Sequence, residues 1–254
     1  MSFENITVEH DGAIATVTLN RPKALNALTP DMLADLGTAL SDITTDKALS
    51  VVILTGAGRA FCAGVDLKAL QAAGIDISAG NVGDDLNNAA RGVIETMTRM
   101  PQAVIAKVNG FCFTGGVELM LAADIVIAAE EAKLGDTHAV LGFRPTWGMT
   151  QRLPRAVGMM RAKELSFTAR HISGLEAAQY GLALEAVPAA DLDDHVAGLA
   201  RKIAVNSAGS VAAYKDLYSK AENSGLNDGL SYENNTNYDI EDVGSRLNTF
   251  LVRL

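Results

Sequence analysis

The segment that most constrains this chain is residues 109–124, which read NGFCFTGGVELMLAAD. A run of apolar residues at positions 103–108 leads into it, and the sequence after Gly115 and Gly116 has the pattern of a buried helix. Glycine has no Cβ, so a ligand or a neighbouring loop can approach its backbone closely. The first N–H groups of a helix have no acceptor within that helix. We therefore predict a strand, a loop and then a helix that presents the N–H of Gly115 to whatever lies in front of it.

Glu118 adds a candidate acid or base to this segment. It follows Gly115 by three residues, about one helical turn, so its carboxylate is expected on the same side as the Gly115 amide. A backbone donor beside a carboxylate suits a reaction in which negative charge develops next to a proton transfer. The alternative interpretation is an ordinary amphipathic helix, because acidic residues favour the first turn of any helix.

A second segment of the same design, residues 59–68, favours the functional interpretation. Apolar residues 50–54 predict a buried strand, and a glycine-rich loop and the sequence AFCAGVDLK follow it. Gly64 precedes Val65 there, and Asp66 can cap a helix. The N–H of Val65 is therefore a second donor, and two backbone donors that converge on one oxygen form an oxyanion hole. Neither loop has the glycine pattern of a P-loop or of a dinucleotide site.

Composition limits the partners that this chain can have. Its 254 residues, 48% of them hydrophobic, suffice for one large domain, alone or with a small appendage. The net charge of -9 disfavours nucleic acid and anionic membranes as partners, because there is no excess basic field. We find no signal-peptide pattern and no apolar run of membrane-spanning length, so we expect a cytoplasmic protein. Cys62 and Cys112 lack metal-type spacing, so we expect reduced packing residues and no metal site.

Strand and helix patterns alternate along the first part of the chain. A hairpin is predicted around Asp11-Gly12, and further strands at residues 50–54, 103–108 and 125–128. Predicted helices at 31–43, after an N-cap at Thr29, and at 86–100 lie between them. This alternation predicts an α/β fold with parallel strand pairing. Residues 161–254 read as mainly helical, so we divide the chain into a core, residues 1–160, and a helical C-terminal region for oligomer contacts.

Four stretches together resemble the crotonase (enoyl-CoA hydratase/isomerase) superfamily. They are NRPKALNAL at 20–28, GRAFCAGVDLK at 58–68, VNGFCFTGGVELMLAADIVIA at 108–128 and GMTQRLPRAVG at 148–158. They stand in the order and spacing of the family across nearly the whole chain. The resemblance implies a crotonase-like spiral of ββα repeats in residues 1–160, which binds and transforms acyl-CoA, and a C-terminal helical region that builds homotrimers or hexamers.

The resemblance also implies an acyl-CoA thioester substrate, with no cofactor other than the coenzyme A that the substrate carries. The thioester carbonyl would then lie between the N–H groups of Val65 and Gly115. The resemblance places the adenine and pantetheine path along Lys23, Ala24, Leu25, Ala63, Asp66, Leu67 and Lys68. For Lys23 and Lys68 the alternative is a solvated surface lysine.

One position departs from the pattern of the family. Its hydratases use two glutamates around the catalytic water, and Glu118 matches the first, whereas His138 stands where the second is expected. Histidine titrates near neutrality and could serve as the second acid or base, or it could only donate hydrogen bonds within the pocket wall. Asp136 could hold its imidazole or cap a turn. Phe143 and Trp147 are expected to shape the acyl pocket.

We predict an enoyl-CoA hydratase of fatty acid metabolism, with Glu118 and His138 as catalytic residues. The first alternative is an enoyl-CoA isomerase that shuttles a proton on Glu118 alone, although isomerases usually keep the other glutamate. The second is a non-catalytic acyl-CoA-binding homologue, which the presence of Glu118 disfavours. A Ser-His-Asp hydrolase is disfavoured because no serine lies in a nucleophile elbow.

Overall fold

The main sheet of this protein consists mostly of parallel strands. The computed structural model describes residues 3–78 and 80–252. The main sheet has the order β1-β2-β3-β5-β7-β10, with β1 and β2 antiparallel and the other pairs parallel. Every residue of β3 is buried, as expected for a strand covered on both faces. The strands are β1 (Ile6–Asp11), β2 (Ile14–Leu19), β3 (Val51–Gly56), β5 (Ala103–Val108), β7 (Ile125–Ala129) and β10 (Glu185–Val187).

A smaller sheet lies beside the main one, in the order β4-β6-β8-β9. Its strands are β4 (Ala60–Cys62), β6 (Phe111–Phe113), β8 (Lys133–Gly135) and β9 (Ile172–Ser173). Each of β4, β6 and β8 follows a strand of the main sheet and is followed by a short helix: α2 (Leu67–Ala72), α4 (Gly115–Met120) and α5 (His138–Leu141). The chain therefore repeats a ββα unit three times. Because β4, β6 and β8 are neighbours, the starts of these three helices are brought together.

Local capping signals place several helices where the sequence predicts them. α1 (Pro30–Thr45) begins at Thr29, whose side chain accepts from the N–H of Met32. α1 packs against α3 (Asp84–Arg99) through an apolar face. Ser173 followed by Glu176 also predicts a helix start, and α8 (Gly174–Gln179) begins at their capping box. The hairpin at Asp11 is also confirmed.

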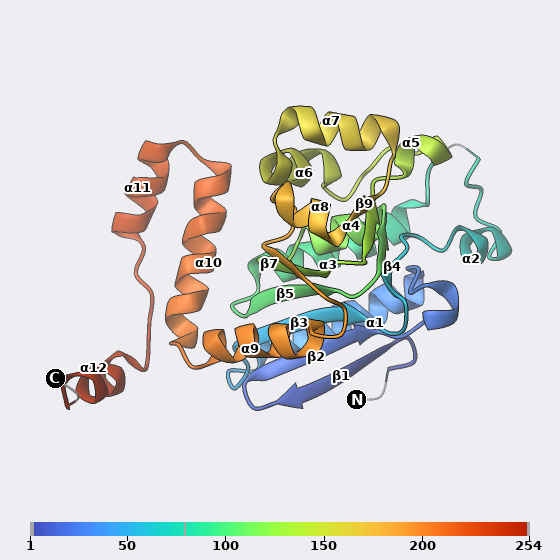
Figure 1. Ribbon diagram of the computed structural model, residues 1–254. Helices are drawn as coiled ribbons and strands as arrows, with labels where there is room; N and C mark the ends of the chain where they lie inside the picture. Colours follow the sequence, from blue (N-terminus) through green and yellow to red (C-terminus); the bar gives the residue numbers. More distant parts are fainter. Residues whose placement is uncertain (1–2, 79, 253–254) are drawn as a thin grey trace.

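The C-terminal part of the chain is mainly helical. Its helices are α6 (Met149–Val157), α7 (Met159–Thr168), α8, α9 (Leu192–Ala204), α10 (Ala208–Asn223), α11 (Leu226–Asn235) and α12 (Val243–Val252). α9 contacts strands of the main sheet, whereas α10, α11 and α12 extend to the left in Figure 1, away from α2 and α5. Within the described residues, no helix is both long and apolar enough to cross a membrane.

The α/β prediction, with parallel pairing and a C-terminal helical region, is confirmed. The sequence also predicts one helix over residues 228–242. This prediction is wrong in its second half, because α11 ends at Asn235 and a new helix begins at Val243. The sequence did not predict the two short strands after residue 161: β9 lies at the edge of the smaller sheet and β10 at the edge of the main sheet. The division at residue 160 stays a prediction.

The two cysteines are neighbours across the smaller sheet. Cys62 in β4 is in register with Cys112 in β6, and both are free and fully buried. Burial raises the pKa of the Cys62 thiol to about 12, and burial likewise raises that of Cys112. A thiol that stays protonated and inaccessible is a poor nucleophile, so both cysteines act as packing residues.

Candidate active site

A cavity of about 100 Å³ lies where α2, α4 and α5 begin. Its wall includes most of the residues that the sequence places around the reacting group and several of those assigned to the acyl chain. From the predicted set, the wall contains Ala63, Val65, Leu67, Gly115, Glu118, His138, Phe143 and Trp147. Lys23, Ala24, Leu25, Asp66 and Lys68 lie outside the lining of this cavity.

The two glycine loops touch each other at the edge of the cavity. A Cβ on Gly64 would lie 2.1 Å from Oγ1 of Thr114, and a Cβ on Gly116 would lie 2.1 Å from the carbonyl oxygen of Cys62. Glycine is therefore required at both positions for the loops to approach this closely. Val65 and Gly115, which adjoin these glycines, both line the cavity.

These two amides have no acceptor within the residues that the structure describes. Val65 follows Gly64, whose φ of +94° turns the chain, and Gly115 is the first residue of α4. Thr114 has φ 45° and ψ −112°, a conformation that a β-branched residue rarely adopts. Strain of this kind persists where the surrounding structure imposes it, often at a functional site. The two N–H groups can donate to one ligand oxygen.

Glu118 projects from α4 and is held by one of its carboxylate oxygens. Oε1 accepts from the N–H of Trp147 at 2.9 Å and from the N–H of Met149 at 3.1 Å. Oε2 faces Nε2 of His138 at 3.8 Å. The residue is only 2% exposed. Burial raises the pKa of the Glu118 carboxyl, although the two amides and His138 partly oppose this effect. A carboxyl group fixed at one oxygen and reactive at the other suits proton transfer.

His138 is held by a carboxylate on its other side. Nδ1 lies 2.6 Å from Oδ1 of Asp136, and Oδ2 of Asp136 accepts from the hydroxyl of Ser166 at 2.7 Å. The backbone N–H of His138 also donates to Oδ1 of Asp136, at 3.3 Å, so both predicted roles of Asp136 are present in the geometry. Burial alone would raise the pKa of Asp136, but the hydrogen bonds from His138 and Ser166 outweigh it and lower that pKa.

Trp147 packs against Gly115 in the cavity wall. A Cβ on Gly115 would lie 2.5 Å from the indole ring, so Gly115 leaves the space that this ring occupies. The indole Nε1 donates to Oδ1 of Asn87 at 2.8 Å. Asn87 lies on the buried face of α3, among apolar residues. The sequence analysis did not identify it, although a polar residue within an apolar helical stripe is a visible signal.

The residues predicted for coenzyme A lie on neighbouring segments. The N–H of Ala63 donates to the carbonyl of Leu25 at 3.0 Å, so the loop of Lys23 and Ala24 is tied to the segment that precedes Val65. Asp66 caps α2 through the N–H of Ala69 and pairs with Arg21 at 2.9 Å; its carboxylate therefore has structural partners. Lys68 and Lys23 are exposed. Their binding role stays a prediction.

Comparisons with known proteins agree with this geometry. The chain matches the family model described as enoyl-CoA hydratase/isomerase over residues 9–247. It is 36% identical over 225 residues to a protein of Arabidopsis thaliana named probable enoyl-CoA hydratase 1, peroxisomal, a match that covers 89% of this chain and 79% of the relative. It is also 36% identical over 234 residues to the short-chain-enoyl-CoA hydratase of Clostridium acetobutylicum, covering 92% and 88%. The crystal structure of an enoyl-CoA hydratase from Bacillus anthracis matches with a TM-score of 0.86 at 40% identity, covering 91% of this chain and 88% of that one.

Proposed function

We propose that this chain, which belongs to the enoyl-CoA hydratase/isomerase family, is an enoyl-CoA hydratase that adds water across the 2,3 double bond of an enoyl-CoA thioester. One observation carries the proposal: the free oxygen of the buried Glu118 carboxylate shares a cavity with the unbonded amides of Val65 and Gly115. Relatives over most of the chain are named enoyl-CoA hydratase. The hydratase prediction made from the sequence is thereby confirmed.

The two amides stabilise the high-energy species of this reaction. When water adds to C3, the electrons of the double bond move toward the thioester carbonyl and place negative charge on its oxygen. The N–H groups of Val65 and Gly115 donate to that oxygen more strongly as the charge grows, so they stabilise the transition state more than the substrate. The loss of one such donor typically costs about 10²–10³ in rate.

Glu118 and His138 handle the water and the proton. Because Oε2 of Glu118 and Nε2 of His138 are 3.8 Å apart, one water could bond to both at about 2.8 Å, with an angle of about 85° between the two bonds. One group takes a proton from this water as the C3–O bond forms. The other group delivers a proton to C2 as the enolate collapses. The sum is the addition of one water molecule, and no cofactor takes part beyond the coenzyme A of the substrate.

The two alternatives have less support. An isomerase moves a proton between C2 and C4 without adding water, so a second group beside Glu118 is not needed. His138, within 4 Å of Glu118, is better explained by a reaction with water. A non-catalytic acyl-CoA-binding protein does not need a buried carboxyl with a raised pKa, because burial of an ionisable group costs stability.

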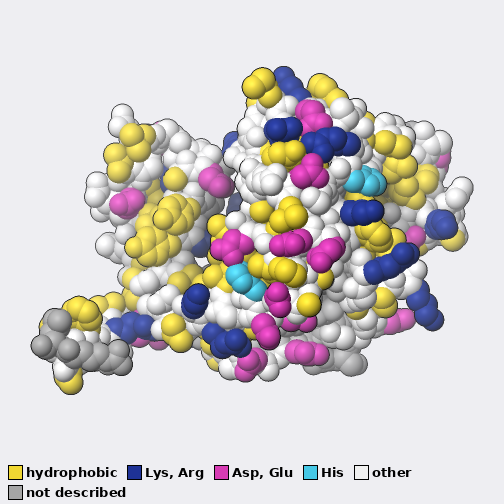
Figure 2. All heavy atoms as spheres, viewed as in Figure 1, with side chains coloured by type: hydrophobic (Ala, Val, Ile, Leu, Met, Phe, Trp, Pro, Cys, Tyr) yellow, Lys and Arg dark blue, Asp and Glu magenta, His cyan; other side chains and the backbone are white. Residues whose placement is uncertain are grey.

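The binding of coenzyme A and the assembly complete the proposal. Lys23, Ala24, Leu25, Ala63, Leu67 and Lys68 would line the path of the nucleotide and pantetheine, and Asp66 would hold the shape of that path by capping α2. The apolar residues on α10–α12, which Figure 2 shows gathered on the left of the molecule, would pack in a homotrimer or hexamer. We propose a cytoplasmic location, although one relative carries a peroxisomal name.

Incubation with crotonyl-CoA tests the function directly. Hydration removes the conjugated double bond, so the absorbance of the enoyl thioester is expected to fall and 3-hydroxybutyryl-CoA to accumulate. Free crotonate, which lacks the thioester and the nucleotide, should neither bind tightly in calorimetry nor react. Tight binding of several enoyl-CoA thioesters without any hydration would contradict the proposal and favour the non-catalytic homologue.

A further inference from the structure

Four polar side chains form a chain that ends in the cavity. Ser166 of α7 donates to Oδ2 of Asp136 at 2.7 Å, and Oδ1 of Asp136 lies 2.6 Å from Nδ1 of His138. Nε2 of His138 then faces Oε2 of Glu118 at 3.8 Å. Asp136 and Glu118 are 5% and 2% exposed, and the His138 side chain is 14% exposed. Ser166 and Glu118 lie on α7 and α4, Asp136 follows β8, and His138 begins α5. Only Glu118 and His138 of these four line the cavity.

The direction of these hydrogen bonds assigns the proton on the imidazole. The Ser166 hydroxyl and the backbone N–H of His138 both donate to Asp136, which suits an ionised carboxylate. An ionised carboxylate can only accept, so Nδ1 of His138 must carry a proton to bond to it. In the neutral imidazole, Nε2 then carries a lone pair. That lone pair points toward Glu118 and the space for the water.

We infer that Asp136, backed by Ser166, is a positioning residue that keeps His138 in the Nδ1–H tautomer, so that Nε2 of His138 is the base for the attacking water and Glu118 is the acid that protonates C2. This inference rests on the proposed hydratase function and deepens it by assigning the two proton transfers. Burial of Glu118, which raises its pKa, supports the role of a proton donor.

The steps balance in atoms and electrons. Nε2 of His138 takes a proton from water as the water oxygen bonds to C3, and the electrons of the double bond move to the carbonyl oxygen between Val65 and Gly115. The Glu118 carboxyl then gives its proton to C2, and the enolate returns to the thioester. The imidazolium of His138 finally transfers its proton to the Glu118 carboxylate, 3.8 Å away, which restores both groups.

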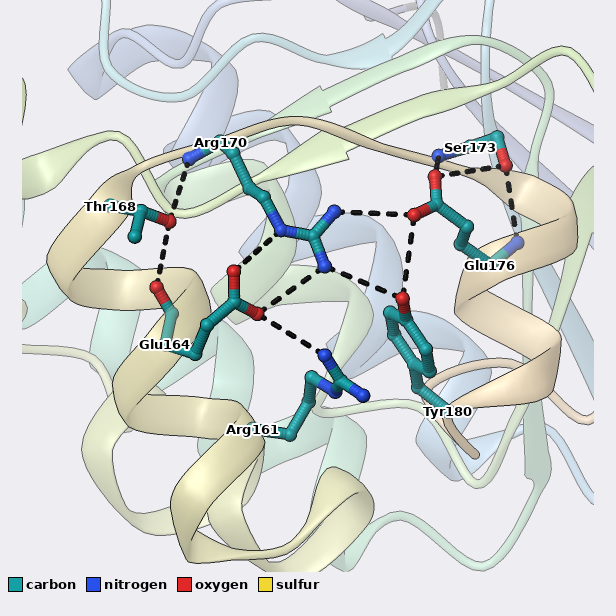
Figure 3. Close-up of polar contacts among 7 residues, drawn as sticks. All are labelled: Arg161, Glu164, Thr168, Arg170, Ser173, Glu176 and Tyr180. Atoms are coloured by element: carbon teal, nitrogen blue, oxygen red, sulfur yellow. Dashed lines mark hydrogen bonds and ion pairs between the residues drawn. The ribbon is translucent and has the colours of Figure 1, made fainter.

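The charged and polar groups around His138 come from several segments. Glu118 from α4 and Asp136 from its own loop face the imidazole, and Arg144 is the other charged residue of the same cavity wall. α7 presents the hydroxyl of Ser166 to Asp136. The end of α7 is tied to the start of α8 through Arg170, which pairs with Glu164 of α7 and Glu176 of α8 (Figure 3).

Asp136→Asn is the decisive variant. Its amide can donate to Nδ1, which favours the other tautomer and leaves a proton on Nε2. We expect kcat for crotonyl-CoA to fall about 10²-fold or more, with KM within a few-fold of that of the wild type. The pH profile of kcat is expected to change as well, because Asp136→Asn removes the negative charge beside the imidazole. A kcat within about threefold of the wild type and an unchanged pH profile would overturn the inference.

Variants of Ser166, on α7, are expected to have smaller effects than Asp136→Asn. Ser166→Ala removes the bond to Oδ2 of Asp136 and is expected to lower kcat about 10-fold, whereas Ser166→Thr keeps the hydroxyl and should lose less. Glu164→Gln is the matched control, since it alters α7 at its surface and is expected to leave kcat unchanged. Equal losses of kcat in Ser166→Ala and Glu164→Gln would mean that both variants act through the packing of α7. That result would overturn the role assigned to Ser166.

Nitrogen-15 spectra of the imidazoles provide a readout that is independent of turnover. The chain has four histidines, and loss of one signal in His138→Gln assigns that residue. We expect a protonated Nδ1 and a bare Nε2 in the wild type, and the reverse in Asp136→Asn. A protonated Nε2 in neutral wild-type His138 would overturn the inference even if Asp136→Asn failed to fold. A wild type with the expected tautomer but without hydratase activity would instead contradict the proposed function.

Discussion

Two clusters of ionisable side chains in this protein have equally short contacts but differ in burial. One is the buried cluster of Glu118, Asp136 and His138, and the other is the surface cluster around Arg170 that Figure 3 shows. The shortest contact is 2.6 Å in both, from Nδ1 of His138 to Asp136 and from Nε of Arg170 to Glu164. The buried carboxylates are 2% and 5% exposed, whereas the side chains of Arg170 and Glu164 are both 34% exposed.

Water accounts for the difference between the clusters. In the buried cluster the loss of solvent is the largest effect on Glu118 and raises its pKa, which favours the protonated carboxyl that the proposed role requires. In the surface cluster, hydrogen bonds from Arg170 dominate and lower the pKa of Glu164, so that carboxylate stays charged and only anchors α7. Asp136, whose contact with His138 is as short as that of Glu164 with Arg170, also has a lowered pKa. Burial, together with a longer contact to His138, therefore sets Glu118 apart from both. The following experiments test this contrast, from the largest expected effect to the smallest.

Glu118→Gln is expected to have the largest effect. The amide oxygen can still accept from the N–H groups of Trp147 and Met149, but the side chain can no longer gain or lose the catalytic proton. Turnover of crotonyl-CoA should fall by about the 10²–10⁴ typical of acid–base catalysis. Calorimetry with 3-hydroxybutyryl-CoA should show that binding is kept. Turnover close to that of the wild type would move the catalytic role to another residue of the cavity.

His138→Gln is expected to follow. Glutamine keeps a donor and an acceptor but cannot take a proton, so we expect a fall in turnover of about 10²-fold. The pH profile of the variant should differ from that of the wild type, because the variant lacks the group that takes the proton. His195, which pairs with Glu185 on the surface at 2.8 Å, offers the matched control: His195→Gln should change neither turnover nor the profile. Near-normal turnover in His138→Gln would leave Glu118 as the only acid or base.

The pH dependence of stability should differ in sign between Glu118 and Asp136. The raised pKa of Glu118 means that its contribution to stability is present below about pH 4.5, the ordinary value, and is lost as the pH rises through its folded pKa. Thermal unfolding of Glu118→Gln should therefore match the wild type in acid and exceed it toward neutral pH. The lowered pKa of Asp136 contributes stability above about pH 3.8, which is lost as the pH falls. Asp136→Asn should accordingly flatten the acid side of the curve, and parallel curves for both variants would contradict the burial argument.

Arg170→Gln is expected to have the smallest effect. Its ion pairs with Glu164 and Glu176 are solvated, and such pairs contribute little and weaken with salt. We expect the melting temperature to fall by no more than about 3 °C at low salt and by less at high salt. Turnover should not change. A loss of activity comparable to that of Ser166→Ala would show that this surface cluster also positions the buried one.

The site could be predicted where its signals are local. The helix start at Gly115, the cap at Asp66 and the capping box at Ser173 are each set by residues within a few positions, and each is found where expected. The sequence did not predict α5, which has only four residues. A helix this short has almost no intrinsic stability, so its formation depends on neighbours that its own sequence does not reveal.

The sequence by itself determined the glycines that let two loops meet, the periodic apolar runs of the strands and helices, and the presence of an ionisable carboxyl group at Glu118. Those features depend on backbone freedom, hydrophobic period and residue chemistry, all of which are local. Only the tertiary structure decided that the amides of Trp147 and Met149 would hold Glu118 from 29 and 31 residues away, and that Ser166 and Asp136 would stand behind His138. Contacts across that separation, and the exclusion of water that alters the chemistry of the groups within them, arise only when the chain has folded and buried them.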